Sequence, residues 1–486
     1  MKRRISLLLV LVMVLSLCLV LPAGAAATEK LSILYPGTES DAMTAFLQGP
    51  FAQKVKADLN MEVEFTFLPW DQYWEQKDIM LAAQRPIDLY WDGLPDLASM
   101  VNKKQAQPLD ELLAQYGQDM KKVLPDSQLA GGKVNGVLYG IPSAYAPSSG
   151  MYQFVCLRQD LLEAVGMTEV KTPEDLKQYA TLVAEQLPQY KGPADPIFKP
   201  LTRYFADEQY FWVGFAELAV FGEETQKAYS YAQTEAFQEV AKFNRDMYLE
   251  GLYSDDLTIK YNERTSRIQS GLYLWGEGSL GKANEIIGAV KANDPDATLE
   301  SYLLAPEKPR YINATGGEVI CVPYSAQNPA GAVKFLNWLY SSQENYLFCL
   351  YGVKGVDYDI SESGRLIPLS DAAKGEGYLY EWMFRNVNYQ VFPESTSQEY
   401  IDTYLSWDKD AKASGMLGFK FNNANVVDVE TACNQVFGQK LAPILYGFVD
   451  FETEYPAAIE ELKAAGIDQY IAEINKQLEE FKATQK

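Results

Sequence analysis

The chain of 486 residues contains no histidine and carries 65 acidic against 42 basic side chains, a formal net charge of −23. The missing imidazole excludes Ser-His-Asp and Cys-His nucleophiles and histidine-based zinc sites. The acidic balance argues against nucleic acid or anionic lipid as partners, because both depend on lysine and arginine. With 48% hydrophobic residues, the length suits two large lobes or three smaller units.

The first 27 residues have the pattern of a signal peptide. The basic start Met1-Lys2-Arg3-Arg4 precedes an apolar run over residues 5–21 and a stretch of small residues. Residues 1–27 are therefore predicted to direct export. An uncleaved membrane anchor is an alternative, which the shortness of the apolar run weakens. A lipid anchor at Cys18 is a second alternative, disfavoured because Leu17 stands where a small residue is needed.

The remaining cysteines lie far apart along the chain, and each is interpreted as standing in an apolar context. No C-x-x-C pair or histidine is present to complete a zinc site, so we expect neither a metal nor a cofactor. An exported protein could pair these cysteines, but the spacing favours buried free thiols. The residues concerned are Cys156, Cys321, Cys349 and Cys433.

Strands and helices alternate at the start of the mature chain. Residues 31–35 read as a strand, and residues 41–59 as a helix that Gly49-Pro50 should kink or break. A strand over residues 63–67, a helix over 73–84 and a strand over 87–93 follow. This alternation predicts the α/β class, with a mainly parallel sheet covered by helices on both faces.

Aromatic and acidic residues gather where these strands end. Ligands of such sheets bind outside the carboxyl ends of the strands. The first strand is followed by Glu39, and the next two end with Trp70 and Asp71 and with Trp91 and Asp92. We expect these five residues to contact a bound molecule.

A glycine-rich segment follows the strand-like residues 272–275. Residues 276–283 match both G-x-G-x-x-G and G-x-x-x-x-G-K. Nucleotide binding is disfavoured, because Ala283 replaces the hydroxyl that magnesium needs and Glu277 puts negative charge inside the loop. A close-packed turn that exposes Trp275 and Glu277 is the preferred interpretation.

Two loops are candidate crossings between lobes. Asn135-Gly136 predicts a tight hairpin, and the loop that follows it runs to Gly150. A return crossing is expected near Thr315-Gly316-Gly317. The chain should end in two helices, one beginning at Pro456 and stopped by Gly466, the second carrying an apolar stripe from Ile467 to Phe481.

The order of these motifs resembles the extracellular solute-binding proteins of bacterial ABC importers, specifically the carbohydrate-binding group. The matching segments are Pro69-Trp70-Asp71, Asp88-Leu89-Tyr90-Trp91-Asp92-Gly93, Leu157-Arg158-Gln159-Asp160-Leu161-Leu162 and residues 132–142 and 328–340. A closer resemblance is to one branch of this family, whose members are often lipid-anchored and have a characteristic C-terminal domain. It rests on residues 351–358, 415–419 and 465–478. The Cys18 region departs from that branch.

The resemblance implies a two-lobed periplasmic-binding-protein-like clamp with discontinuous lobes. Residues 28–143 and 318–372 would form the first lobe, and residues 144–317 and 373–486 the second. Such a protein closes on a sugar or oligosaccharide outside the cell, hands it to an ABC permease and works as a monomer without a cofactor or catalytic residues.

A sugar site needs aromatic plates for C–H faces and polar groups for hydroxyls. In addition to the residues at the strand ends, the candidates are Tyr210, Trp212, Trp382, Arg385 and Asn386, although the aromatic ones could equally be core. Trp338 is assigned to the core. A secreted glycoside hydrolase and a peptide-binding receptor are the alternatives. Without histidine, ligand affinity is expected to be nearly flat between pH 6 and 8.

Overall fold

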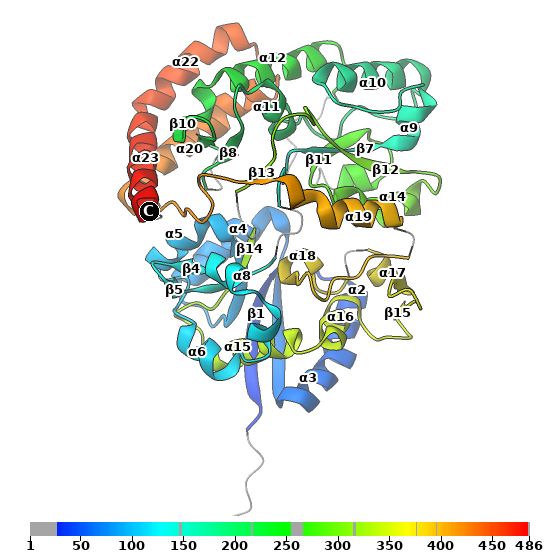
Figure 1. Ribbon diagram of the computed structural model, residues 1–486, viewed down its shortest axis with the longest axis vertical. Helices are drawn as coiled ribbons and strands as arrows, with labels where there is room; N and C mark the ends of the chain where they lie inside the picture. Colours follow the sequence, from blue (N-terminus) through cyan, green and yellow to red (C-terminus); the bar gives the residue numbers. More distant parts are fainter. Residues whose placement is uncertain are drawn as a thin grey trace, which may run out of the picture.

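In the computed structural model the chain forms two lobes, one above the other in Figure 1. The structure describes residues 27–144, 148–214, 217–253, 266–313, 317–375, 377–394 and 396–484. The signal peptide predicted over residues 1–27 lies outside these ranges except for Ala27, and Cys18 lies outside them too. Among the described residues no helix has the length and apolar character to cross a membrane.

The first lobe is built on a five-stranded sheet. Its order is β2 (Met61–Leu68), β1 (Glu29–Pro36), β3 (Leu89–Gly93), β14 (Glu318–Cys321) and β6 (Gly140–Pro142). Strand β1 runs parallel to β2 and β3, which confirms the prediction for the three N-terminal strands. Strand β14 is antiparallel to β3 and to β6, so the sheet is mixed.

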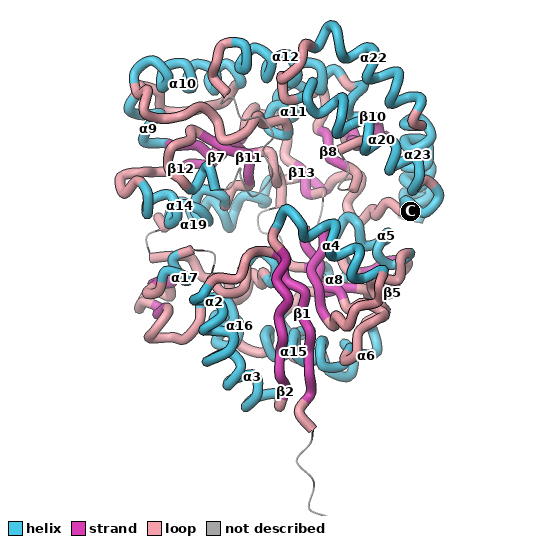
Figure 2. Tube along the Cα trace, turned by 180° about the vertical axis from the view of Figure 1, so that it is seen from behind, coloured by secondary structure: helices cyan, strands magenta, loops and turns pink. Residues whose placement is uncertain are grey.

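Helices cover this sheet on both faces, and Figure 2 shows α15 (Pro329–Tyr340) behind β1. The break expected at Gly49-Pro50 is present, because Gly49 has φ −104° and ψ −106° between α2 (Asp41–Phe46) and α3 (Ala52–Leu59). Trp338 on α15 is buried, as expected. The other helices are α4 (Trp70–Ala82), α5 (Leu97–Asn102), α6 (Asp110–Tyr116), α7 (Met120–Val123), α8 (Asp126–Gly131) and α16 (Gln343–Tyr351).

The second lobe contains two three-stranded antiparallel sheets. One has the order β11 (Trp275–Gly278), β7 (Phe154–Arg158), β12 (Leu299–Leu303), and the other the order β10 (Lys227–Ser230), β9 (Ala219–Gly222), β8 (Tyr210–Trp212). Around them lie α9 (Gln159–Ala164), α10 (Pro173–Gln186), α11 (Lys199–Phe205), α12 (Glu235–Leu249) and α14 (Lys282–Asn293). Thr172 begins α10 with a full capping box.

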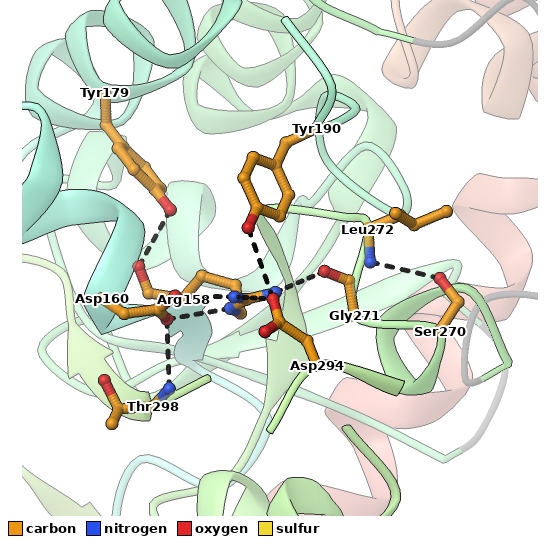
Figure 3. A network of polar contacts seen from close by, with 9 residues as sticks. All are labelled: Arg158, Asp160, Tyr179, Tyr190, Ser270, Gly271, Leu272, Asp294 and Thr298. Atoms are coloured by element: carbon orange, nitrogen blue, oxygen red, sulfur yellow. Dashed lines mark hydrogen bonds and ion pairs between the residues drawn. The ribbon is translucent and has the colours of Figure 1, made fainter. Parts of the chain in front are cut away.

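An ion network fixes the end of β7 to three neighbouring segments (Figure 3). The guanidinium of Arg158, 1% exposed, lies 2.6 Å from carboxylate oxygens of both Asp160 and Asp294 and donates to the Gly271 carbonyl. The Tyr179 hydroxyl donates to the Arg158 carbonyl at 2.9 Å. These contacts tie α9, α10 and the end of α14 to one strand.

The C-terminal helices pack onto the second lobe. They are α20 (Val427–Val436), α21 (Ala442–Leu445), α22 (Phe451–Ala464) and α23 (Ile467–Thr484). Tyr470, Ile474 and Leu478 are fully buried in the hydrophobic cluster that contains Phe237 of α12. The start predicted for α22 at Pro456 is wrong, because Asp450 caps the helix and accepts a hydrogen bond from the Thr453 amide.

Hydrogen bonds join the crossing segments between the lobes. The Ser143 hydroxyl donates to Glu318 at 2.9 Å, and the Ala144 amide donates to the Arg385 carbonyl at 3.0 Å. The C-terminal crossing leads from α18 (Glu381–Phe384) to α19 (Gln398–Ser406). Residues of α18 belong to the first-lobe cluster, which favours a lobe boundary later than 372, and the expected lobe division stays a prediction.

Among the described residues the four cysteines are free and buried, as predicted. Burial raises the pKa of the Cys156 thiol to about 12 and that of Cys433 to about 11. Thiols with such pKa values form little thiolate at neutral pH and react slowly.

Candidate functional site

Five aromatic rings form a cluster at the carboxyl ends of β2 and β3, which we call the aromatic platform. Trp70 begins α4 directly after β2, and Trp91 lies in β3. The ring centroid of Trp91 lies 5.5 Å from that of Trp70, 5.1 Å from that of Trp74 and 5.3 Å from that of Trp382. Tyr380 stacks on Trp382 at 5.3 Å with an interplanar angle of 16°.

The platform has a buried base and a partly exposed upper layer. Trp91 is 6% exposed, whereas Trp74 is 40% exposed and Trp70 and Trp382 are partly exposed. Helix α4 and α18 carry this upper layer on the side of the first lobe that lies toward the second (Figure 1). Flat, partly exposed indoles supported from below are a preorganised binding surface.

Contacts from the first strand hold Tyr380 in place. The Tyr35 hydroxyl accepts a hydrogen bond of 2.6 Å from the Tyr380 amide. Gly37 follows β1 with φ +108°, and a Cβ atom there would lie 2.3 Å from the Tyr380 hydroxyl oxygen. The chain therefore needs glycine at this position, both for the dihedral and for the close approach.

A buried ion pair lies beneath the platform. Asp92, 2% exposed, accepts from Lys77 at 2.5 Å and from the Gly93 amide at 2.8 Å. Burial raises the pKa of Asp92 above its usual value, although Lys77 opposes the shift. Asp92 thus fixes α4 against β3, and its expected ligand contact stays a prediction.

A carboxylate that the sequence analysis missed lies between the lobes. Asp96 follows β3 by three residues and is partly exposed at the start of α5. Burial, the nearby Asp92 and Glu430 of the second lobe raise the pKa of Asp96 to about 7. A Cβ atom at Gly214, which closely follows β8 of the second lobe, would lie 3.8 Å from Asp96 Oδ1.

The second lobe contributes aromatic rings around a lysine. The Lys199 ammonium lies 5.5 Å from the ring centroid of Trp212 and 5.3 Å from that of Tyr152. Tyr152 is 45% exposed and has φ +60°, a strained dihedral for this residue type. Glu277 accepts a 3.1 Å hydrogen bond from the Lys199 amide, and its expected ligand contact stays a prediction.

Several expected site residues are occupied elsewhere. Trp275 is 1% exposed and packs on Tyr179 of α10, so its expected exposure is wrong. Tyr210 is buried, and its hydroxyl bonds to Asp207 at 3.3 Å. Of the other four expected residues, Arg385 is buried in an ion pair with Glu381, and Asn386 is buried. Glu39 and Asp71 are exposed at the starts of α2 and α4.

The glycine-rich segment forms a packed turn, as preferred. Residues 275–278 are strand β11 and α14 begins at Lys282. A Cβ atom at Gly278 would lie 2.7 Å from the Lys282 side chain, so the turn is closely packed at this glycine. Within the described ranges, no group of three or more His, Cys, Asp or Glu side chains is placed to hold a metal ion.

The structure adds residues that sequence reasoning did not select, namely Trp74, Asp96, Tyr152, Lys199 and Tyr380. The sequence could have indicated Trp74, because it lies four residues after Trp70 and so shares the same face of α4. Tyr380 joins the platform, and Tyr152 approaches Lys199, through packing between segments that are distant in the sequence. Local sequence patterns do not show such packing.

Comparisons with known proteins agree with this architecture. Residues 38–346 match the family of bacterial extracellular solute-binding proteins, and residues 415–483 match a domain of unknown function (DUF3502). A Streptococcus pneumoniae protein named carbohydrate ABC transporter substrate-binding protein is 22% identical over 443 residues, which cover 88% of this chain and 85% of that protein.

Solved structures show the same fold. The N-glycan transport solute binding protein NgtS from Streptococcus pneumoniae, in complex with Man5GlcNAc, has a TM-score of 0.77 at 20% identity and covers 94% of this chain and 99% of its own. Alginate-binding protein AlgQ2 has a TM-score of 0.63 at 15% identity, with coverage of 94% and 99%. The family expected from the order of the sequence motifs is confirmed, and the chain belongs to the bacterial extracellular solute-binding proteins.

Proposed function

We propose that this protein captures a sugar or oligosaccharide outside the cell and delivers it to the permease of an ABC importer. The observation that carries the proposal is the aromatic platform, in which Trp70, Trp74 and Trp382 are partly exposed. The carbohydrate-related names of the similar proteins support the same ligand class.

The chemistry of a pyranose fits the side chains that the two lobes offer. Its apolar C–H faces pack on indole rings, which the first lobe supplies, and its hydroxyls need charged or polar partners. The second lobe offers Lys199 and Glu277 beside Trp212. Closing the lobes would remove water from both surfaces and strengthen the hydrogen bonds to the hydroxyls.

The cellular setting follows from the same proposal. The signal pattern of residues 1–27 suits an exported protein that works as a monomer beside the permease. Ordinary cleavage of that segment is favoured over a lipid anchor at Cys18. Mass spectrometry of the mature protein tests this point, since a diacylglycerol adduct on Cys18 would contradict it.

Intrinsic tryptophan fluorescence, titrated with panels of glycans and peptides, tests the ligand class. Saturable quenching by at least one glycan is expected, with an affinity at least about tenfold weaker in Trp382→Ala. The control Trp338→Phe changes a buried indole outside the platform and should retain the affinity. Saturation by peptides alone would overturn the sugar proposal in favour of a peptide receptor.

A glycoside hydrolase is the second candidate, and Asp96 is the observation that favours it. A carboxyl group with a pKa of about 7 can act as a general acid at neutral pH. Incubation with the glycans that bind, followed by chromatography, separates the two functions. Recovery of intact oligosaccharide supports a binding protein, whereas cleavage that is lost in Asp96→Asn would establish the hydrolase.

A further inference from the structure

A sharp turn leads into the first strand of the second lobe. Residues 148–153, which we call the crossing turn, lie directly before β7. Two of them have a positive φ, Gly150 at +76° and Tyr152 at +60°. The Gln153 amide donates to the Gly150 carbonyl at 2.9 Å, which closes the turn. The chain is therefore tightly bent at the point where it enters the second lobe.

A carboxylate from the C-terminal crossing holds the start of this turn. Asp408 lies in the 3-10 turn η4 (Trp407–Asp410), which directly follows α19. It accepts hydrogen bonds from the amide and the hydroxyl of both Ser148 and Ser149, with distances between 2.5 and 3.0 Å. The two serines are buried. Because one ionised group receives four hydrogen bonds from adjacent residues, the crossing turn is firmly held at this end.

The neighbouring Trp407 holds the other parts of the turn. Its indole N–H donates to the Ser149 carbonyl at 3.1 Å, and its ring centroid lies 5.5 Å from that of Phe154, the first residue of β7. Arg310 fixes the indole, because its guanidinium carbon lies 4.2 Å from the ring centroid and Nη2 donates to the Trp407 carbonyl at 2.8 Å. Turn η4 therefore contacts both the crossing turn and the strand that follows it.

Tyr152 is the strained residue of the crossing turn. Its side chain is 45% exposed, so burial in a core does not explain the positive φ. Such a conformation is unfavourable for tyrosine, persists only where the surrounding structure enforces it, and is concentrated at functional sites. The Tyr152 ring lies beside the Lys199 ammonium, which also lies over the ring of Trp212. The strain thus places an exposed ring next to the side chains that the second lobe offers to a sugar.

These second-lobe side chains lie next to the first lobe. Trp212 and Lys199 are both partly exposed. Gly214 follows Trp212 by two residues, and a Cβ atom there would lie 3.8 Å from Asp96 Oδ1 of the first lobe. The part of the second lobe that carries Trp212, Lys199 and Tyr152 therefore borders the space in which a ligand between the lobes would lie.

We propose that Tyr152 is a ligand-contact residue of the second lobe and that Asp408 is the positioning residue that holds it in place. The proposal rests on the proposed function and deepens it, because it adds one aromatic contact to the same sugar site. It also gives the C-terminal crossing a task in binding. Asp408 acts through Ser148 and Ser149 and does not itself touch the ligand.

Replacement of Tyr152 by glycine separates a ligand contact from a structural role. Tyr152→Gly removes the ring but relieves the positive φ, so the unfolding temperature should stay within about 2 °C of that of the wild type. Affinity for the glycan that binds most tightly in the fluorescence panel should fall at least about tenfold. Unchanged affinity, with or without a loss of stability, would overturn the assignment of Tyr152.

A double-mutant cycle tests the role of Asp408. Asp408→Ala should weaken glycan binding at least about fivefold in the wild type but less than about twofold in Tyr152→Gly, because no ring is left to position. The control Asp450→Ala removes a carboxylate that also accepts from an amide and a hydroxyl, those of Thr453 at 3.0 Å each, and should retain the affinity. Equal losses in the two backgrounds would overturn the positioning role.

A spin label reports on the crossing turn without any ligand. In Tyr152→Cys the label attaches to the new cysteine, because the four described native thiols are buried. The label should be immobilised when Asp408 is present, and should move faster in Asp408→Ala but not in Asp450→Ala. Identical spectra with and without Asp408 would overturn the positioning role. Absence of glycan binding by the wild type would instead contradict the proposed function and the ligand contact, while the spectra still decide whether Asp408 holds the turn.

Discussion

The platform depends on individual side chains with distinct tasks. Trp70, Trp74 and Trp382 present partly exposed rings, whereas Trp91 and the Lys77–Asp92 pair beneath them are buried and support them. Because the buried residues already hold the rings in place, ligand binding does not have to order these side chains. Less conformational entropy is lost, and the affinity is higher. The binding surface and its foundation are therefore different residues.

Residue patterns predicted part of this arrangement. Trp70, Trp91 and Trp382 were selected from the sequence and meet in one cluster, because strand ends and a return segment converge there. Trp275 was selected by the same reasoning, but its face of β11 is covered by α10. A motif at the end of a strand does not indicate which helices cover that end, so the exposure of Trp275 could not be predicted from the sequence.

Arg158 provides a prediction on stability at the residue scale. Arg158→Met would leave Asp160 and Asp294, both about a quarter exposed, without their shared cation. We expect the free energy of unfolding to fall by about 3 kcal/mol in urea denaturation. The surface control Arg85→Met should change it by less than about 0.5 kcal/mol. Equal midpoints for Arg158→Met and wild type would contradict a stabilising role of this network.

The ends of β1 and β2 and the start of α4 determine where the platform residues lie. Pro69 ends β2 and starts α4, which places Trp70 at the strand end, and the positive φ of Gly37 ends β1 beside Tyr380. These turns were readable from the sequence, as were the break at Gly49 and the hairpin at Asn135-Gly136. The position of α18 beside the platform could not be predicted from the sequence, because it follows from packing against Tyr35, more than 300 residues earlier.

Gly37→Ala tests the link between the end of β1 and the platform. The added Cβ would collide with the Tyr380 hydroxyl and strain a positive φ, so affinity for a bound glycan should fall at least about tenfold. The control Gly136→Ala also has a positive φ, but nothing lies within 4 Å of its Cβ. Both variants should lose stability, yet only Gly37→Ala should lose affinity in fluorescence titrations; unchanged affinity would contradict this role.

At the scale of the whole molecule, the C-terminal helices are part of the second lobe and also touch the first. Tyr470, Ile474 and Leu478 are buried against core residues of α12, whereas the 3-10 turn η5 (Asn423–Asn425) contacts α5. The sequence indicated a C-terminal helical pair but not the contact with α5, because that contact joins segments about 320 residues apart. The absence of histidine predicts ligand affinity that is nearly independent of pH between 6 and 8, and this stays a prediction.

Removal of residues 415–484 tests whether this domain is separable. Because its helices complete the second-lobe core, the truncated chain should unfold at least about 10 °C below the full chain, or fail to remain soluble. Thermal unfolding followed by circular dichroism measures the difference. A truncated chain with an unchanged unfolding temperature would show that the domain is only an appendage.

A carbohydrate is expected to bind between the lobes on the aromatic platform. The most direct measurement is a crystal structure grown with the oligosaccharide that binds most tightly in the fluorescence panel. We predict a pyranose ring stacked on Trp382 or Trp70, with hydroxyls bonded to polar groups of both lobes. Density for the sugar elsewhere, with the platform bare, would contradict the account.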